Sequence, residues 1–264
     1  MHDDSLTRKR ISRGLKTRCI GKRLLVFPVL TSTMDIARQE AVKRAPEGTA
    51  VIAERQTAGR GRLKRTWLTT EGNIAVSIII YPPKEYIQSL IMLASLAVLN
   101  SIRTLTGIEC QLKWPNDVLV GGKKVCGILI ETKTQIDCLE YAILGIGINV
   151  NMKMAGYPEL FSLATSLSEE TDKPMSRARL LRLLFTELER LYLGMLSGKS
   201  LYDDWSRNLS TVGKAVRVQS GETVLEGTAE SVKEDGSLIL RLEDNSVKRI
   251  TIGDVSLREE KEGG

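Results

Sequence analysis

The sequence predicts an α+β fold, in which helices pack on a mixed β-sheet and a small all-β domain follows. Over residues 21–211 strand-like and helix-like segments are interspersed, and several consecutive strands are joined by short turns. Hairpin-joined strands mixed with helices favour α+β over a purely parallel α/β sheet. Over residues 212–264 short apolar segments alternate with Gly-Glu, Asp-Gly and Asp-Asn turns, which is typical of a small all-β domain. Residues 1–20 precede both regions as a basic arm.

The individual elements follow from apolar periodicity and from turn residues. Apolar, β-branched runs predict strands of the large domain at 23–30, 49–55, 73–80, 110–114, 117–120, 124–131 and 138–150. Helical spacing of apolar residues predicts helices at 31–45, 86–106 and 176–197. We expect Ser32 or Thr33 to cap the first helix, and Gly121 and Gly122 to turn a hairpin. The small domain is expected to hold strands at 215–220, 224–232, 237–243 and 247–253.

The positive charge of the chain is concentrated at its N-terminus. The net charge is +6, and residues 1–23 carry eight basic and two acidic side chains, so the remaining residues are formally neutral. A neutral body with 5% aromatic residues does not resemble a nucleic-acid-binding domain. We therefore expect the basic arm to be a solvated tail, and we expect no sequence-specific binding of DNA.

Several classes of protein are disfavoured by what the chain contains. The longest apolar run, at 90–99, is too short to cross a bilayer, and the N-terminus has no apolar signal region, so we expect a cytoplasmic protein. The cysteines match no zinc spacing and are expected to be reduced thiols: Cys19, Cys110, Cys126 and Cys138. The only histidine is His2. Because Ser-His-Asp and Cys-His mechanisms need a placed histidine, the chemistry is expected to use Lys, Arg, Asp, Glu and backbone amides.

A glycine–arginine loop at 58–67, AGRGRLKRTW, is the first candidate site. Its basic side chains, which repel one another, are Arg60, Arg62, Lys64 and Arg65. Glycines let backbone amides approach an anion, and arginines bind phosphate or carboxylate through charge-assisted hydrogen bonds. Anion binding is therefore favoured, while a solvated basic turn and a polyanion contact stay open. We also expect residues 58–66 to be mobile until a negatively charged ligand offsets their mutual repulsion.

The segment at 112–131, LKWPNDVLVGGKKVCGILIE, is the second candidate. Lys113 lies in an otherwise apolar strand, where an ammonium is costly unless it is paired or bound to a ligand. Pro115 ends this strand, and the hairpin that follows returns Lys123 and Lys124 to the same neighbourhood. The alternative is an edge-strand lysine followed by a common Pro-Asn-Asp turn.

Taken together, these segments resemble the biotin–protein ligases. The matching segments, in the family's order and spacing, are STMD (32–35), ERQTAGRGRLKRTW (54–67), LKWPNDVLV (112–120), KKVCGILIE (123–131) and LGIGINV (144–150). The resemblance extends over about residues 20–258. GRGRxxRxW followed about fifty residues later by KWPND is highly specific. Some relatives carry an N-terminal winged-helix domain, for which the roughly 20 residues before the matched region are too few.

The resemblance implies an enzyme with a class II synthetase/biotin–lipoate ligase-like catalytic domain and an SH3-like β-barrel. Such ligases join biotin to ATP as biotinyl-5′-AMP and then transfer biotin to a lysine of a biotin carboxyl carrier domain. The implied biotin contacts are Ser32, Thr33, Gln56, Gly59, Arg60, Lys124 and Gly127. The implied ATP and adenylate contacts are Arg60, Arg62, Arg65, Trp67, Lys113, Asn116 and Asn149, with Trp67 beside the adenine. Lys113 and Arg62 are the implied catalytic residues, and Asp117 is the implied Mg²⁺ ligand.

Met34 is a departure from the family pattern, since many relatives have asparagine there. We expect Met34 to pack beneath its helix and not to contact a ligand directly. A lipoyl or octanoyl transferase of the same fold, which should lack the GRGRxxRxW loop, and a biotin-sensing DNA-binding regulator are the alternatives. Family members often pair their central sheets, so a homodimer is expected as well.

Overall fold

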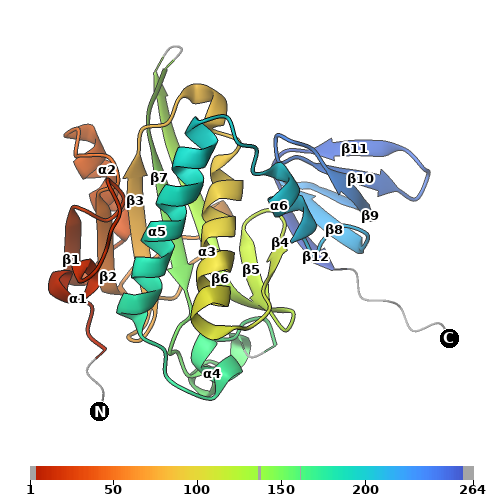
Figure 1. The fold of residues 1–264 in the computed structure, drawn as a ribbon. Coiled ribbons are helices and arrows are strands. Elements are labelled where there is room, and N and C mark those ends of the chain that lie inside the picture. Colours follow the sequence, from red (N-terminus) through yellow and green to blue (C-terminus); the bar gives the residue numbers. More distant parts are fainter. Residues whose placement is uncertain (1–3, 136–137, 161, 258–264) are drawn as a thin grey trace.

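The computed structural model of the chain describes residues 4–135, 138–160 and 162–257. A seven-stranded mixed sheet forms the large domain, and its strand order is β1-β2-β3-β7-β6-β5-β4 (Figure 1). The strands are β1 (Leu24–Leu30), β2 (Ala50–Gln56), β3 (Ile74–Ile80), β4 (Gln111–Lys113), β5 (Asp117–Val120), β6 (Lys123–Gln135) and β7 (Cys138–Ile148). β1 and β2 pair in parallel and the other neighbours are antiparallel. The seven strands predicted for the large domain are therefore confirmed.

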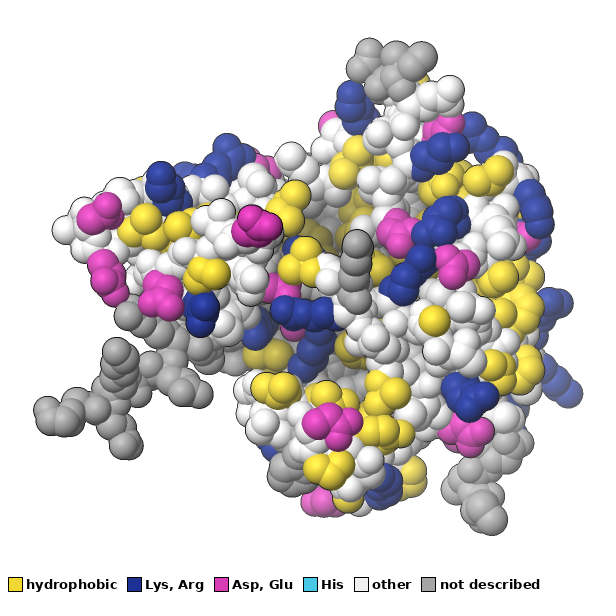
Figure 2. All heavy atoms as spheres, turned by 180° about the vertical axis from the view of Figure 1, so that it is seen from behind, with side chains coloured by type: hydrophobic (Ala, Val, Ile, Leu, Met, Phe, Trp, Pro, Cys, Tyr) yellow, Lys and Arg dark blue, Asp and Glu magenta, His cyan; other side chains and the backbone are white. Residues whose placement is uncertain are grey.

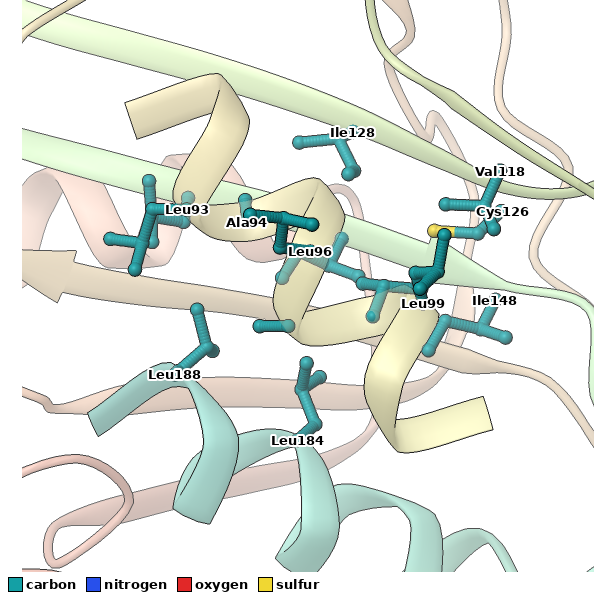
Figure 3. Close-up of a cluster of buried hydrophobic side chains, with 14 of the residues drawn as sticks. Leu93, Ala94, Leu96, Leu99, Val118, Cys126, Ile128, Ile148, Leu184 and Leu188 are labelled. Atoms are coloured by element: carbon teal, nitrogen blue, oxygen red, sulfur yellow. The ribbon is translucent and has the colours of Figure 1, made fainter. Parts of the chain in front are cut away.

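Two long helices cover one face of this sheet. α3 (Leu90–Thr106) and α5 (Arg177–Leu196) pack against each other and against the strands, and Figure 3 shows Leu99 of α3 beside strand residue Ile148, and Leu184 and Leu188 of α5 facing α3. Eleven of the seventeen residues of α3 are buried. Each buried leucine contributes roughly 1.5–3 kcal/mol to the free energy of folding. α3 starts later than predicted because residues Lys84–Tyr86 form a separate 3₁₀ turn.

The opposite face of the sheet is only partly covered. α2 (Thr33–Val42) lies over it, and the side chains of Met34, Ala37 and Ala41 pack against Val51 and Ile143 in a second apolar cluster. The backbone N–H of Met34 donates to Ser32 Oγ, so Ser32 is the cap of this helix. The remainder of this face stays open for the cavity described below.

The N-terminal arm is packed against the large domain, so the expectation of a solvated tail is wrong for residues 4–20. The arm includes a short helix, α1 (Arg8–Ser12). Leu6, Ile11 and Ile20 are 4%, 0% and 1% exposed and belong to the main core. Apolar residues spaced among the arginines and lysines therefore bury one side of the arm, while most of its basic groups face solvent. His2 lies outside the described residues.

Two buried charged residues of α5 attach this arm. The Arg177 guanidinium, which is 4% exposed, donates to Asp4 Oδ2 at 2.7 Å and to Glu54 Oε2 at 2.5 Å. The Glu189 carboxylate accepts the three consecutive backbone N–H groups of residues 18–20. Although burial opposes ionisation, these amide hydrogen bonds hold the pKa of Glu189 below its usual range.

The C-terminal region is a five-stranded antiparallel sheet, consistent with the expected small β-domain. Its order is β11-β10-β9-β8-β12, with β8 (Ala215–Ser220), β9 (Thr223–Val232), β10 (Leu238–Leu242), β11 (Val247–Ile250) and β12 (Asp254–Leu257). β12 was not predicted, and neither were α1, α4 (Leu167–Thr171) and α6 (Tyr202–Arg207). Trp114 joins the two sheets, since its Nε1 donates to the carbonyl of Gly236 at 2.8 Å.

None of the helices in the described part of the chain combines the length and apolar character that spanning a membrane requires.

Candidate functional site

A cavity opens on the sheet face opposite α3 and α5. Side chains alternate across a strand, so Leu144, Ile146 and Ile148 of β7 enter the main core while the two glycines between them face the other way. Small residues of β3, β6 and β7 hollow this face at Ala75, Ser77, Gly127, Gly145 and Gly147. The resulting volume is about 160 Å³, which exceeds the space needed for one water molecule many times over. The face opposite to that in Figure 1 is hollowed, with Lys and Arg side chains near its middle (Figure 2).

Twelve of the fourteen residues that the family resemblance singled out line this one cavity. They are Ser32, Thr33, Gln56, Arg60, Arg62, Arg65, Trp67, Lys113, Asn116, Asp117, Lys124 and Gly127. Gly59 and Asn149 are the two that do not line it. Segments separated by up to about ninety residues are therefore brought together, because the sheet places β2, β6 and β4 around one hollow.

The N-terminus of α2 supplies a buried polar corner of the cavity. Thr33 N–H donates to Gln56 Oε1 at 2.8 Å, and the hydroxyls of Thr33 and Ser77 share a hydrogen bond of 2.7 Å. Gln56 Nε2 in turn donates to Thr69 Oγ1 at 2.9 Å. Ser32 and Thr33 are 2% and 3% exposed. This network fixes the side-chain orientations, so the corner presents preorganised polar groups to a ligand.

Trp67 lies directly over the glycines of β6 and β7. A Cβ atom on Gly147 would come within 2.3 Å of the indole, and one on Gly127 within 2.9 Å. Lys124 Nζ is 5.3 Å from the ring centroid, which is a cation–π distance. The indole therefore adjoins Lys124 and Gly127, the residues expected at biotin, although the resemblance placed it beside the adenine.

The glycine–arginine loop folds back on itself as a small hairpin. Trp67 N–H donates to the carbonyl of Gly59 at 2.9 Å, and Gly61 N–H donates to the carbonyl of Arg65 at 2.7 Å. A Cβ on Gly59 would lie 2.3 Å from the Trp67 carbonyl oxygen, so glycine is required there for close approach of two backbones. The amide of Gly61 is used inside the hairpin and is not available to an anion, whereas the arginine side chains carry donor groups of their own.

Arg60 is held by acidic residues at the mouth of the cavity. Its guanidinium lies 2.6 Å from Asp35 Oδ1 in the first turn of α2 and 3.8 Å from Glu131 Oε1 of β6. Arg38 pairs with the same two carboxylates. The four side chains form one alternating network of charges, 30–41% exposed, that ties the loop to α2 and β6.

Arg62 and Arg65 are held by the small domain. Asp254 at the start of β12 places Oδ2 2.6 Å from Arg65 Nη1 and Oδ1 3.6 Å from Arg62 Nη1. Arg62 also donates to Asn116 Oδ1 at 3.1 Å and to the carbonyl of Gly253 at 3.2 Å. Burial lowers the pKa of Arg62, and the nearby carboxylates of Asp254 and Asp117 oppose that shift. An arginine guanidinium is not deprotonated in proteins, so Arg62 brings a positive charge to the cavity.

Lys113 differs from the other cations of the cavity. Lys124 Nζ is 2.7 Å from Asp117 Oδ1, and each of the three cavity arginines has a carboxylate partner. Among the residues that the structure describes, no ion-pair or hydrogen-bond partner is found for the Lys113 ammonium. Lys113 thus offers a positive charge that the protein's own acids have not neutralised.

The described residues contain no group of three or more His, Cys, Asp or Glu side chains that could hold a metal ion. Asp117 lines the cavity as a single carboxylate beside Lys124. Mg²⁺ commonly uses one or two carboxylates together with substrate phosphates. Asp117 therefore fits a metal that arrives with a nucleotide, and does not by itself make a metal centre.

Asn149 lies outside the cavity lining. It is 6% exposed, and its Nδ2 donates to the carbonyl of Thr165 at 3.1 Å, while its backbone N–H donates to Val125. In this arrangement it holds the segment before α4. Met34, which is 4% exposed, packs in the second core cluster as expected, and it also forms part of the cavity wall.

Several cavity residues were not singled out from the sequence. Ser77, Gly145 and Gly147 carried a signal, because small residues alternating with large ones in a strand mark a close approach of another group. Asp254 and Val255 carried none, since they lie in the unpredicted strand β12. Their position depends on how the small domain packs against the large one.

Comparison with known proteins agrees with this geometry. Residues 26–149 match the model of the Biotin/lipoate A/B protein ligase family, and residues 211–258 match the Biotin protein ligase C terminal domain. The chain is 36% identical to the bifunctional ligase/repressor BirA of Bacillus subtilis over 96% of this chain and 79% of that protein. It is 33% identical to the biotin--[acetyl-CoA-carboxylase] ligase of Mycobacterium tuberculosis, over 92% and 94% of the two chains.

Solved structures lead to the same assignment. The biotin protein ligase of Aquifex aeolicus in complex with biotin and ATP superposes with a TM-score of 0.76 at 31% identity, over 90% of this chain and 99% of that one. The fold, the cavity and these similarities together define an adenylate-forming type of ligase. The chain belongs to the biotin protein ligase family.

Proposed function

We propose that this protein attaches biotin to a lysine of a biotin carboxyl carrier domain, with ATP as the source of energy. The observation that carries the proposal is the cavity itself. It joins a buried polar corner, an unneutralised lysine and an arginine loop, and it is lined by twelve residues that match the family's motifs. Tight binding of a small organic acid and positioning of a nucleotide phosphate are the two tasks that such a lining supports.

In the first step a carboxylate oxygen of biotin attacks the α-phosphorus of ATP, and pyrophosphate leaves. Ser32, Thr33 and Gln56 orient biotin at the polar corner. The Lys113 ammonium lies against the carboxylate and the α-phosphate, where negative charge grows in the transition state. Preorganised charges at such a position lower the barrier by electrostatic stabilisation, so the step needs neither a protein nucleophile nor a histidine.

In the second step the ε-amine of the acceptor lysine attacks the carbonyl carbon of the mixed anhydride. AMP leaves with the bridging oxygen, the amine loses a proton, and an amide remains. Arg60, Arg62 and Arg65 retain the adenylate until the acceptor arrives. Trp67 packs beside the bound intermediate. Mg²⁺ bound with ATP would neutralise phosphate charge, with Asp117 as its protein ligand and Asn116 beside the nucleotide.

The proposal also covers partners and location. We include a homodimer, to be tested by sedimentation, and a cytoplasmic location. DNA recognition is not part of the proposed function, although relatives such as BirA of Bacillus subtilis are named as repressors. Ahead of β1 the structure describes one short helix, α1. Any DNA affinity should be weak and should fall steeply with salt, and footprinting of a defined site at physiological salt would contradict this.

The direct test identifies the acyl group and the energy source. Purified protein is incubated with a carrier domain, ATP·Mg²⁺ and either biotin, lipoate or octanoyl-loaded carrier protein. We expect the mass of the carrier domain to increase by one biotinyl group only when both biotin and ATP are present. AMP and pyrophosphate should be released in equal amounts. Transfer of octanoyl without ATP, or preferential use of lipoate, would instead indicate the related transferase or ligase activity.

A further inference from the structure

The contact between the arginine loop and the small domain is a feature that the proposed chemistry does not itself require. Asp254 lies on β12, whose register with β8 is fixed by pairing of Asp254 with Gln219 and of Val255 with Val218. Its carboxylate, 17% exposed, reaches out of the small domain to the loop, which lies about 190 residues earlier in the chain. Both carboxylate oxygens face guanidinium groups of that loop.

Electrostatics gives this contact a specific task. Burial disfavours the charge on Arg62, and the neighbouring Arg65 guanidinium adds to that cost. A single carboxylate between the two guanidiniums offsets this repulsion. The backbone carbonyl of Gly253 accepts a hydrogen bond from Arg62. The small domain therefore contacts the loop through one charged group, the Asp254 carboxylate, and one neutral group, the Gly253 carbonyl. The carboxylate of Asp254 also lines the cavity, together with Val255.

We propose that Asp254 is a positioning residue through which the small domain holds the arginine loop closed over the cavity. The inference deepens the proposed function, on which its consequence for adenylate retention rests. Since Arg62 keeps further donor groups, the anchored guanidinium can still contact a phosphate while Asp254 fixes its direction. Asp254 therefore assists nucleotide binding by preorganisation, instead of competing with phosphate for the arginines.

The test compares Asp254→Asn, which keeps the shape and removes the charge, with Asp254→Glu and with a control. Glu230→Gln is the matched control, because it removes an ion pair of 2.7 Å to Arg241 within the same small domain, away from the cavity. Hydrogen exchange of residues 58–67 is measured in protein without ligand, so this readout does not depend on enzymatic activity. Binding of ATP·Mg²⁺ and escape of biotinyl-AMP are measured separately.

For Asp254→Asn we expect loop exchange and adenylate escape to rise by about threefold to tenfold, since one partly exposed charge-assisted contact is lost. Asp254→Glu should recover part of this loss, and Glu230→Gln should leave the loop unchanged. Unaltered exchange of the loop in Asp254→Asn would overturn the proposal, and so would tighter binding of ATP, since that would make Asp254 a competitor. If loop exchange is faster in Asp254→Asn but the wild-type protein itself forms no biotinyl-AMP, the role of Asp254 in holding the loop stands and the proposed function is rejected.

Discussion

The N-terminal arm and the glycine–arginine loop are both rich in basic residues, yet the structure uses their positive charge in different ways. Both are short and basic; the arm was expected to be a solvated tail, and the loop was expected to be mobile without a ligand. The arm buries Leu6, Ile11 and Ile20 in the main core, and most of its basic side chains face solvent. The loop buries few apolar groups and is held through its arginines, which pair with carboxylates of α2, β6 and β12. Apolar spacing, and not charge, therefore distinguishes a packed segment from one that can respond to a ligand.

The largest expected effect comes from a substitution that detaches the N-terminal arm and leaves the glycine–arginine loop unchanged. Arg177→Met removes the buried guanidinium and leaves Asp4 and Glu54 without their partner. Loss of one member of a buried ionic network costs about 3–5 kcal/mol. Chemical denaturation should show a drop in unfolding free energy of this size, while adenylate formation by the folded fraction stays near normal. An unfolding free energy of Arg177→Met within about 1 kcal/mol of the wild-type value would show that Arg177 does not anchor the arm.

The second-largest effect comes from a substitution in the glycine–arginine loop that leaves the N-terminal arm unchanged. Arg62→Gly removes a phosphate contact of roughly 1.5–3 kcal/mol, so retention of biotinyl-AMP should weaken by about one to two orders of magnitude, mostly through faster escape. Lys113 is untouched, and synthesis of the adenylate should persist. The released intermediate would acylate lysines of bystander proteins. Labelling of a protein without the acceptor domain, compared at matched adenylate production, measures this escape, and no increase would mean that the loop does not retain the intermediate.

A smaller effect concerns how the stability contributed by Glu189 depends on pH. The folded-state pKa of Glu189 is lowered by the backbone amides of residues 18–20, so its stabilisation is present above the unfolded pKa, at neutral pH, and is lost as pH falls through the folded pKa. Glu189→Gln should reduce stability by about 1–3 kcal/mol at pH 7, because three amides lose a charged acceptor. The difference from wild type should shrink as the pH falls below the ordinary pKa of a glutamate, about 4.3, towards the lower folded-state pKa of Glu189. A difference independent of pH would assign the loss to packing alone.

The smallest effect separates the two regions without a mutation. Raising the salt concentration from about 0.05 M to about 0.5 M screens exposed ion pairs far more than apolar burial. Exchange of residues 58–67 should therefore quicken by a few-fold, whereas exchange of the amides near Ile11 and Ile20 should stay constant. A loop insensitive to salt would show that its hairpin hydrogen bonds, and not its arginine pairs, keep it folded. The earlier expectation that ligand orders residues 58–66 stays a prediction for the same measurement with and without biotin.

The sequence revealed those parts of the site in which a short segment carries its own signal. The polar corner at Ser32 and Thr33, the loop arginines and Lys113 each stand in a recognisable motif, and the sheet brings them to one cavity. The packing of the arm was not predicted, because its three buried apolar residues, Leu6, Ile11 and Ile20, are spaced widely among many basic ones.

Other features could not be read locally. The carboxylate at residue 254 meets Arg62 and Arg65 only because two sheets pack together, with Trp114 between them. The glycine at 59 was expected to admit an anion, whereas it admits the backbone of Trp67. In both cases the cause is a tertiary contact across many residues, and neither periodicity nor spacing describes such a contact.

The most direct test of the account is biotin-dependent exchange of pyrophosphate into ATP by Lys113→Ala, with Lys199→Ala as an exposed-lysine control. Lys113 is the cavity cation without an ion-pair partner among the described residues, so its removal should abolish stabilisation of growing charge in the transition state. We expect exchange to fall by about two orders of magnitude or more, as for other preorganised electrostatic groups, with an unchanged melting temperature. The control should exchange normally. Near-normal exchange by Lys113→Ala would contradict the assignment of the catalytic centre.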